Sequence, residues 1–187
     1  MLRPIEEFKR SCGIAGFRDV KIRNVDEFLK IVKARELVDV EVQFFDADVI
    51  ATWQHLYFAA LNALMVFKNR DNLCNSVAME TLLYASGSRQ IQKAMLVVGI
   101  KPTTRNLAVL VLGRNSKTVT SSLSKISVVV GKEPDNSVLE LSQKKSEKIR
   151  RVFNINETEL RALNRGTEEE AVVDLVLEHV ALLSTYL

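Results

Sequence analysis

The stretch LVDVEVQFFDADVIATWQHLYFAALNALMVF, residues 37–67, decides the fold class because its hydrophobic period changes half way along. Over residues 37–45, valine and phenylalanine alternate with aspartate, glutamate and glutamine, which is typical of a β-strand with one covered face. From Asp46 to Phe67, apolar residues recur at three- and four-residue spacing, which predicts a long core helix. A clear strand followed directly by a core helix predicts a domain that contains both a sheet and helices.

Two further segments predict strands. Residues 12–22 mix β-branched and aromatic side chains, and residues 106–113 form a near-continuous apolar run that indicates a strand covered on both faces. Residues 116–131 fit either a helix or a strand, because their β-branched residues oppose their helical period. The remaining periodic segments predict helices at 24–35, 75–86, 89–99, 141–153, 156–164 and 167–187. We expect a single α+β domain over residues 1–187, in which seven or eight helices pack on a small, about three-stranded, mainly antiparallel sheet.

Composition narrows the class of protein. A net charge of +3 and a pI near 8.9 permit nucleic acid or an acidic partner, but they fall short of a non-specific nucleic-acid binder. Cys12 and Cys74 are too far apart for a metal knuckle and suit free thiols in a reducing compartment. The sequence shows no apolar run of the kind that targets or spans a membrane. We expect a soluble, cytoplasmic protein.

Residues that would serve catalysis are sparse. His55 and His179 lie inside apolar helices without carboxylate or cysteine neighbours at ligand spacing, and no glycine-rich phosphate loop follows a strand. Asp46 and Asp48 resemble an acid pair, but a helix start is favoured, with Asp46 as cap and Asp48 in the first turn. We therefore predict no catalytic residues, no metal and no cofactor.

The segment SGSRQIQK, residues 86–93, combines a helix break with basic residues. Gly87 supplies the left-handed residue that ends one helix, and Ser88 is predicted to cap the next. On that next helix a basic face is predicted opposite a buried face of Ile91, Ala94, Met95 and Val98. A solvated surface is the ordinary interpretation of such basic residues. The sharper hypothesis is a phosphate-binding cleft for a short single strand, built from Ser88, Arg89, Gln92 and Lys93 with Lys68 and Arg70 nearby.

The last predicted helix carries two apolar stripes. Five residues on one side are predicted to face the core: Val172, Leu175, Val176, Leu182 and Leu183. Val173, Leu177 and Val180 lie on another side. The second stripe is either buried by the chain itself or covered by a protein partner, and both interpretations stay open.

The segments DADVIATWQHLYFAALNAL, residues 46–64, and METLLYASGSRQIQKAMLVVGIK, residues 79–101, resemble a known family. They are similar to the small kinase-binding subunit of the KEOPS complex, the PRPK-binding protein family. The resemblance covers about residues 36–113, and its most specific part is LLYASGSRQIQKA, residues 82–94.

This resemblance implies a non-catalytic regulatory subunit that binds the N-lobe of the small atypical kinase of the complex. It also implies help in making threonylcarbamoyladenosine in tRNA, with the threonylcarbamoyl transferase subunit as an indirect partner and the single-stranded 3′ CCA end as the bound RNA. Eight residues form the predicted tRNA site: Lys68, Arg70, Ser88, Arg89, Gln90, Ile91, Gln92 and Lys93. The alternative is an independent small-molecule enzyme or sensor with a pocket among the same helices.

Overall fold

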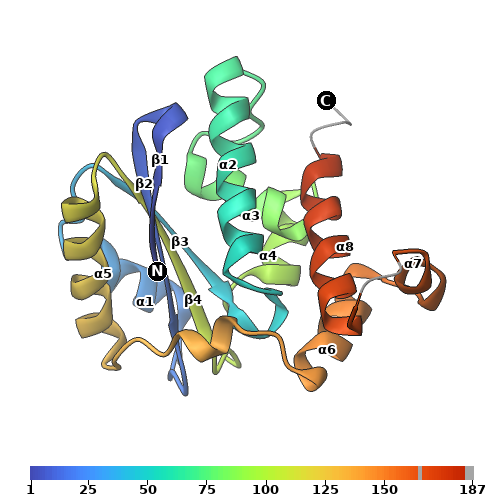
Figure 1. The fold of residues 1–187 in the computed structure, drawn as a ribbon. Coiled ribbons are helices and arrows are strands. Elements are labelled where there is room, and N and C mark those ends of the chain that lie inside the picture. The colour runs from blue at the N-terminus through green and yellow to red at the C-terminus, as the bar shows by residue number, and fades with distance from the viewer. Residues whose placement is uncertain (164–165, 184–187) are drawn as a thin grey trace.

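The computed structural model describes residues 1–163 and 166–183, and within them it confirms an α+β fold (Figure 1). The sheet is antiparallel throughout, with strand order β1-β2-β4-β3. Its strands are β1 (Leu2–Ile5), β2 (Arg10–Phe17), β3 (Val40–Asp46) and β4 (Leu107–Gly113). No helix in these residues is both long enough and apolar enough to cross a bilayer.

Strand β4 lies at the centre of the sheet, as its apolar run predicts. It pairs with β2 and with β3, and each of its residues is buried. The strand beyond the three expected is β1, which adds four residues to the edge of the sheet beside β2. Its Pro4 is tolerated there because an edge strand has backbone positions that need no hydrogen-bond donor. So short a strand carries too little period to be recognised in the sequence.

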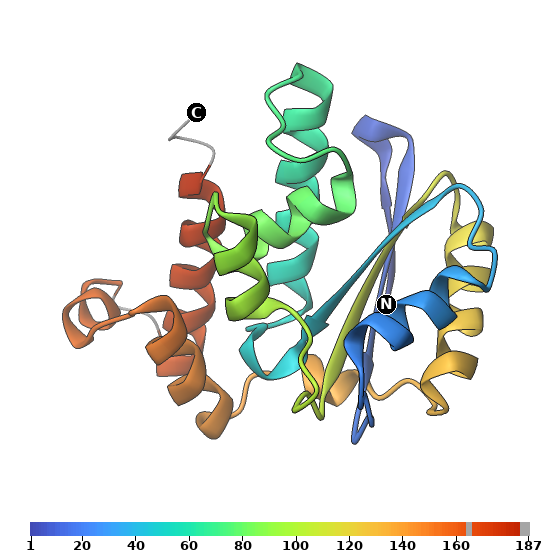
Figure 2. The same ribbon diagram turned by 180° about the vertical axis from the view of Figure 1, so that it is seen from behind.

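One face of the sheet is covered by α1 (Val25–Lys33) and α5 (Ser116–Val130) (Figure 2). The ambiguous segment 116–131 is therefore a helix, capped by the side chain of Asn115, which accepts a hydrogen bond from the Thr118 N–H at 2.9 Å. The predicted cap of α1 is also confirmed, because the Asn24 side chain accepts from the Glu27 N–H at 3.0 Å.

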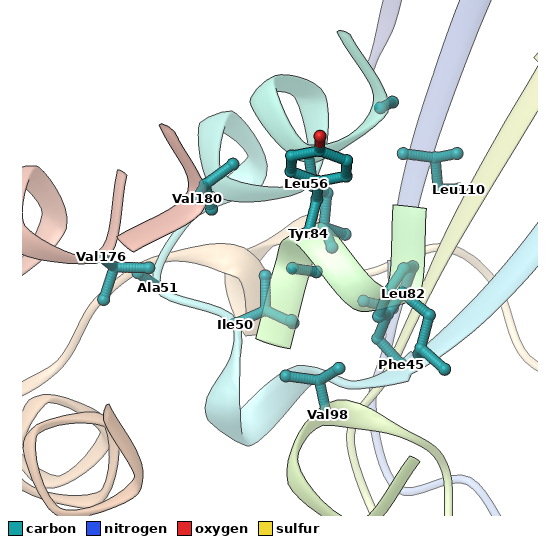
Figure 3. Packing of buried hydrophobic residues seen from close by; sticks show 14 of the residues in the cluster. Phe45, Ile50, Ala51, Leu56, Leu82, Tyr84, Val98, Leu110, Val176 and Val180 are labelled. Carbon is teal, nitrogen blue, oxygen red and sulfur yellow. The ribbon is translucent and has the colours of Figure 1, made fainter. Parts of the chain in front are cut away.

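The remaining helices lie on the other side of the sheet, two of them against its face and the others packed around these two, and their side chains contribute to the larger core cluster (Figure 3). These helices are α2 (Trp53–Asn69), α3 (Val77–Ser86), α4 (Ile91–Val98), α6 (Gln143–Phe153), α7 (Glu157–Ala162) and α8 (Glu168–Leu182). Thr167 and Glu170 form the predicted capping box at the start of α8. The expected ends of the last two helices, residue 164 and residues 184–187, lie outside the described residues.

Helix α2 begins later than the sequence predicts. Asp46 does cap a helical turn, but this is the short 3-10 turn Ala47–Val49, in which the Asp46 carboxylate accepts from the Asp48 N–H at 3.1 Å. The α-helix starts at Trp53. Val49 lies in the 3-10 turn and Ile50 directly follows it, and both are buried. Their spacing from the apolar residues of α2 fits a helix, which is why the sequence predicted an earlier start.

Candidate functional site

The α3–α4 turn is built much as its sequence predicts. Gly87 has φ +61° and ends α3, donating its N–H to carbonyls of the last helical turn. The predicted cap is wrong in detail: the Ser88 hydroxyl accepts from the Gln90 N–H at 3.3 Å, but α4 starts at Ile91 with Gln90 in the capping position. Ser88 is therefore buried in the turn, with 8% of its surface exposed, and Arg89 lies two residues before the start of α4.

A pocket of about 430 Å³ opens beside this turn. It is lined by Gly87, Ser88, Arg89, Gln90, Lys93, His179, Leu182 and Leu183. The structure thus brings four of the predicted RNA-binding residues together. The end of α8 also lines the pocket, which no local sequence pattern indicates, since this segment and the α3–α4 turn are about ninety residues apart in the chain.

Lys68 and Arg70 lie elsewhere. The Lys68 ammonium is 3.2 Å from a carboxylate oxygen of Glu7 and sits over the ring of Phe8, at the start of the chain. Arg70, with φ +65°, ends α2 in the left-handed conformation. Neither residue lines the pocket, so the compact cleft expected from them is not formed with the α3–α4 turn.

The buried face predicted for α4 is narrower than expected. Ala94 and Val98 are fully buried, whereas Ile91 is 42% exposed and Met95 is 52% exposed. Ile91 and Met95 lie further round α4 from Ala94 than Val98 does, so they fall outside the stripe of the helix that meets the core. Gln92 is exposed and lies outside the pocket lining.

The second stripe of α8 is divided between surface and interior. Val180 is 1% exposed and belongs to the core, so for this residue the chain itself buries the stripe, and a partner contact at Val180 is not supported (Figure 3). Val173 and Leu177 are partly exposed. Val180 is buried because α8 packs against α2 and α3. Leu177 lies about 60° further round the helix, and Val173 lies on nearly the same side as Val180 but about two turns earlier.

An apolar face on α2 escaped the sequence interpretation, which assigned most of this helix to the core. Phe58 is 42% exposed and Met65 is 38% exposed, and both lie on the helix that runs beside α8 in Figure 1. Trp53 and Tyr57 on the same helix are half-buried, and the Tyr57 and Phe58 ring centroids are 6.1 Å apart. The available signal was that Phe58 and Met65 fall outside the core period of the helix.

His55 and the Asp46 cluster are tied to structure. His55 is fully buried, contacts the Ala85 carbonyl at 2.8 Å through Nε2, and accepts the Ala51 N–H at 3.3 Å through Nδ1. Burial lowers its pKa to about 4, so the ring is neutral. The Lys148 ammonium lies 3.8 Å from Asp46 and 3.4 Å from Asp48, which ties α6 to the end of β3.

The described part of the chain contains no group of three or more histidine, cysteine, aspartate or glutamate residues that could hold a metal ion. Cys12 and Cys74 are both buried free thiols, and burial raises their pKa values to about 12 and about 11.

Comparison with known proteins identifies a family. Residues 17–184 match the model of a family described as kinase binding protein CGI-121. The chain is also 33% identical, over 170 residues, to the regulatory protein Cgi121 of the archaeon Methanocaldococcus jannaschii. That alignment covers 91% of this chain and 95% of the archaeal protein.

Proposed function

The chain belongs to the CGI-121 family of kinase-binding proteins, and from this premise we propose that it is a non-catalytic regulatory subunit that joins a small atypical kinase to RNA. The complex proposed is KEOPS, in which the kinase would be the direct protein partner and the threonylcarbamoyl transferase an indirect one. The RNA proposed is tRNA, bound through its single-stranded 3′ CCA end for threonylcarbamoyladenosine modification. The localisation proposed is cytoplasmic.

The apolar face shared by α2 and α8 is the proposed kinase contact. It consists of Phe58, Leu61 and Met65 on α2 with Val173 and Leu177 on α8, each at least partly exposed. A surface of aromatic, methionine and aliphatic side chains is typical of the centre of a protein interface. The α2–α8 contact places the two halves of this face on neighbouring helices.

The pocket beside the α3–α4 turn is the proposed RNA contact, and the observation that carries it is the convergence of Arg89, Gln90 and Lys93 on one cavity. Two cationic side chains at a small cavity favour phosphate, and a short basic cleft suits a single strand better than a duplex. Ile91 lies at the start of α4 with its side chain exposed, so it is available to an RNA ligand.

Binding of tRNA with and without its terminal CCA, at two salt concentrations, tests the RNA proposal. We expect the intact end to bind more tightly and the double variant Arg89→Glu, Lys93→Glu to lose that preference. Loss of two single-strand phosphate contacts should reduce the slope of log K against log salt by about 1.4, since each contact contributes roughly 0.7.

A matched double variant, Lys117→Glu with Lys144→Glu, makes the same change in net charge at two exposed sites outside the pocket. It should retain the preference for the intact end. Equal binding of intact and trimmed tRNA by the unmodified protein, with a normal circular dichroism spectrum, would remove this pocket from RNA recognition.

The independent small-molecule enzyme is the less favoured function. Its activity would depend on His55 or Asp46, yet His55 is sealed in the core, and Asp46 caps a turn and pairs with Lys148. Both side chains already have structural partners.

A further inference from the structure

A second pocket lies beside α5 and β2, on the side of the sheet opposite to α2 and α8 (Figure 1). Its volume of about 700 Å³ is within the range of roughly 300–1,000 Å³ that small-ligand sites occupy. Its apolar lining residues are Met1, Ala15, Leu123, Val128 and Pro134. Ala15 is buried and Val128 is 69% exposed, so the apolar lining extends from the sheet to an open rim. Such walls suit the apolar body of a ligand.

Two serine hydroxyls in the lining are held as hydrogen-bond acceptors. Ser124 Oγ donates its hydrogen to the Thr120 carbonyl at 3.1 Å, and Ser127 Oγ donates to the Lys132 carbonyl at 2.7 Å. A hydroxyl has one hydrogen and two lone pairs, and a carbonyl cannot donate, so only the lone pairs remain for a ligand. The polar end of a ligand that meets these serines must therefore be a donor.

Charges around the pocket favour a cation. The lining reaches the end of α5, where the helix dipole is negative, and the last turn of this fully described helix, residues 127–130, carries no basic side chain. The Glu133 carboxylate adds a negative charge to the lining. Lys132 opposes a cation, but its side chain is exposed and long enough to keep its ammonium in water. The Met1 amine already donates to the Ile14 carbonyl, and burial lowers its pKa, which reduces its positive charge.

We propose that this pocket binds a small amphipathic amine, whose apolar body lies against Leu123 and Val128. Its ammonium donates to the oxygens of Ser124 and Ser127, with the Glu133 carboxylate as counter-charge. A carboxylate of the same size is disfavoured, because the two serines offer it no hydrogen and the helix end repels it. The site is independent of the proposed kinase and RNA contacts, since neither of them uses α5.

An NMR titration of the purified chain, followed through its amide chemical shifts, tests the site with two probes of similar size, 2-phenylethylamine and 3-phenylpropanoate. A probe this small is expected to bind with a Kd of about 1 mM, so the titration extends to about 10 mM. The amine should shift the amides of Ala15 and residues 123–133. The acid should leave them unchanged.

Substitutions at the polar end should change the affinity for the amine. Ser124→Ala should weaken it about tenfold, because a charge-assisted hydrogen bond is lost, and alanine keeps the helix stable. Glu133→Gln should weaken it about threefold, as loss of an exposed ion pair does, whereas Lys132→Gln should strengthen it. Glu178→Gln is the matched control, since Glu178 is exposed on α8 and lies outside the lining. It should leave the affinity unchanged.

Three outcomes would overturn the proposal. Equal shifts with the amine and the acid would mean that the pocket does not distinguish donors from acceptors. Amine binding that is unchanged in both Ser124→Ala and Glu133→Gln would remove these groups from the site. Shifts confined to other parts of the chain, or no shifts at the highest probe concentration, would reject an amine site beside α5.

Discussion

His55 shows how a single buried side chain can set the acid sensitivity of the fold. Its ring is fully buried, bonded through both nitrogens, and also meets Phe153 edge to face at 5.7 Å. Burial outweighs the favourable contact with the Ala85 carbonyl, which is why the pKa falls to about 4. The neutral ring therefore belongs to the folded state.

Acidification should destabilise the protein through His55. The unfolded chain binds a proton on this residue more strongly than the folded one, so the free energy of unfolding falls as pH drops from about 6.5 to about 4. The full effect is roughly 3 kcal/mol, since one pKa unit corresponds to about 1.4 kcal/mol. Urea unfolding of the natural protein and His55→Gln across this range checks it, because the variant should show a shallower dependence. Identical pH profiles would contradict the assignment.

Leu177 and Val180 offer a second contrast between single residues on one helix. Leu177→Asp places a charge at a half-exposed position and should abolish kinase association with little loss of thermal stability. Val180→Asp buries a charge in a site that is 1% exposed and should cost several kcal/mol, about 3–5 by comparison with unpaired buried charges. Thermal unfolding together with kinase pull-down separates the two effects. Unfolding by Leu177→Asp would mean that its side of α8 is core.

The link between the two helical layers depends on close packing at one end of β2. The turn η3 (Asn136–Leu139) packs on β2 as the chain passes from α5 to α6. Gly16 donates its N–H to the Asn136 side chain at 3.0 Å, and its carbonyl accepts from the Asp135 N–H at 2.8 Å. A Cβ atom on Gly16 would lie 2.7 Å from the Asp135 carbonyl oxygen. Backbone atoms leave little room to adjust.

Gly16→Ala should therefore lower the free energy of unfolding by about 1–3 kcal/mol, as overpacking does in other cores. Gly131→Ala is the comparison, because Gly131 has φ +68° but open space around it, and so suffers backbone strain of about 1 kcal/mol alone. Denaturant titration should rank Gly16→Ala as the more damaging change. The reverse order would show that η3 moves aside easily.

Among the elements, those with a strong local period were predictable. The alternation before Asp46 predicted β3, and the apolar run of residues 106–113 predicted β4. A strand that is buried on one face has alternating apolar residues, and a strand that is buried on both faces has a continuous apolar run. Segment 116–131 was ambiguous because the packing of α5 on the sheet overrides the strand preference of its valines. Four-residue β1 has no period of its own and depends on pairing with β2.

The two proposed contacts use different flanks of α8. Leu177 and Leu182 lie five residues apart and thus about 140° apart around an ideal helix axis. Leu177 belongs to the apolar face shared with α2, whereas Leu182 lines the pocket beside α4. Kinase and RNA should therefore bind at the same time. Competition between them in a binding titration would mean that the two faces overlap.

One side of the pocket beside the α3–α4 turn could be predicted from the sequence, and the other side could not. The turn in the SGSRQIQK segment could be predicted, because glycine and serine influence the backbone within a few residues of their own position. Its basic residues are visible directly in the sequence. Its partner wall at His179 and Leu182 arises from tertiary packing across some ninety residues, which leaves no local pattern. The exposure of Phe58 and Met65 was readable from the sequence, because both fall outside the core period of α2, whereas the place of α8 beside that helix depends on tertiary packing.

Formation of a complex of this chain, the kinase and tRNA, followed by size-exclusion chromatography with light scattering, tests the joining function most directly. We expect one species that contains all three components. Arg89→Glu with Lys93→Glu should release the tRNA and retain the kinase, while Leu177→Asp should release the kinase and retain the tRNA. Loss of both partners in a folded single-face variant, or tRNA that stays bound without the cationic pair, would contradict separate kinase and RNA contacts on the two flanks of α8.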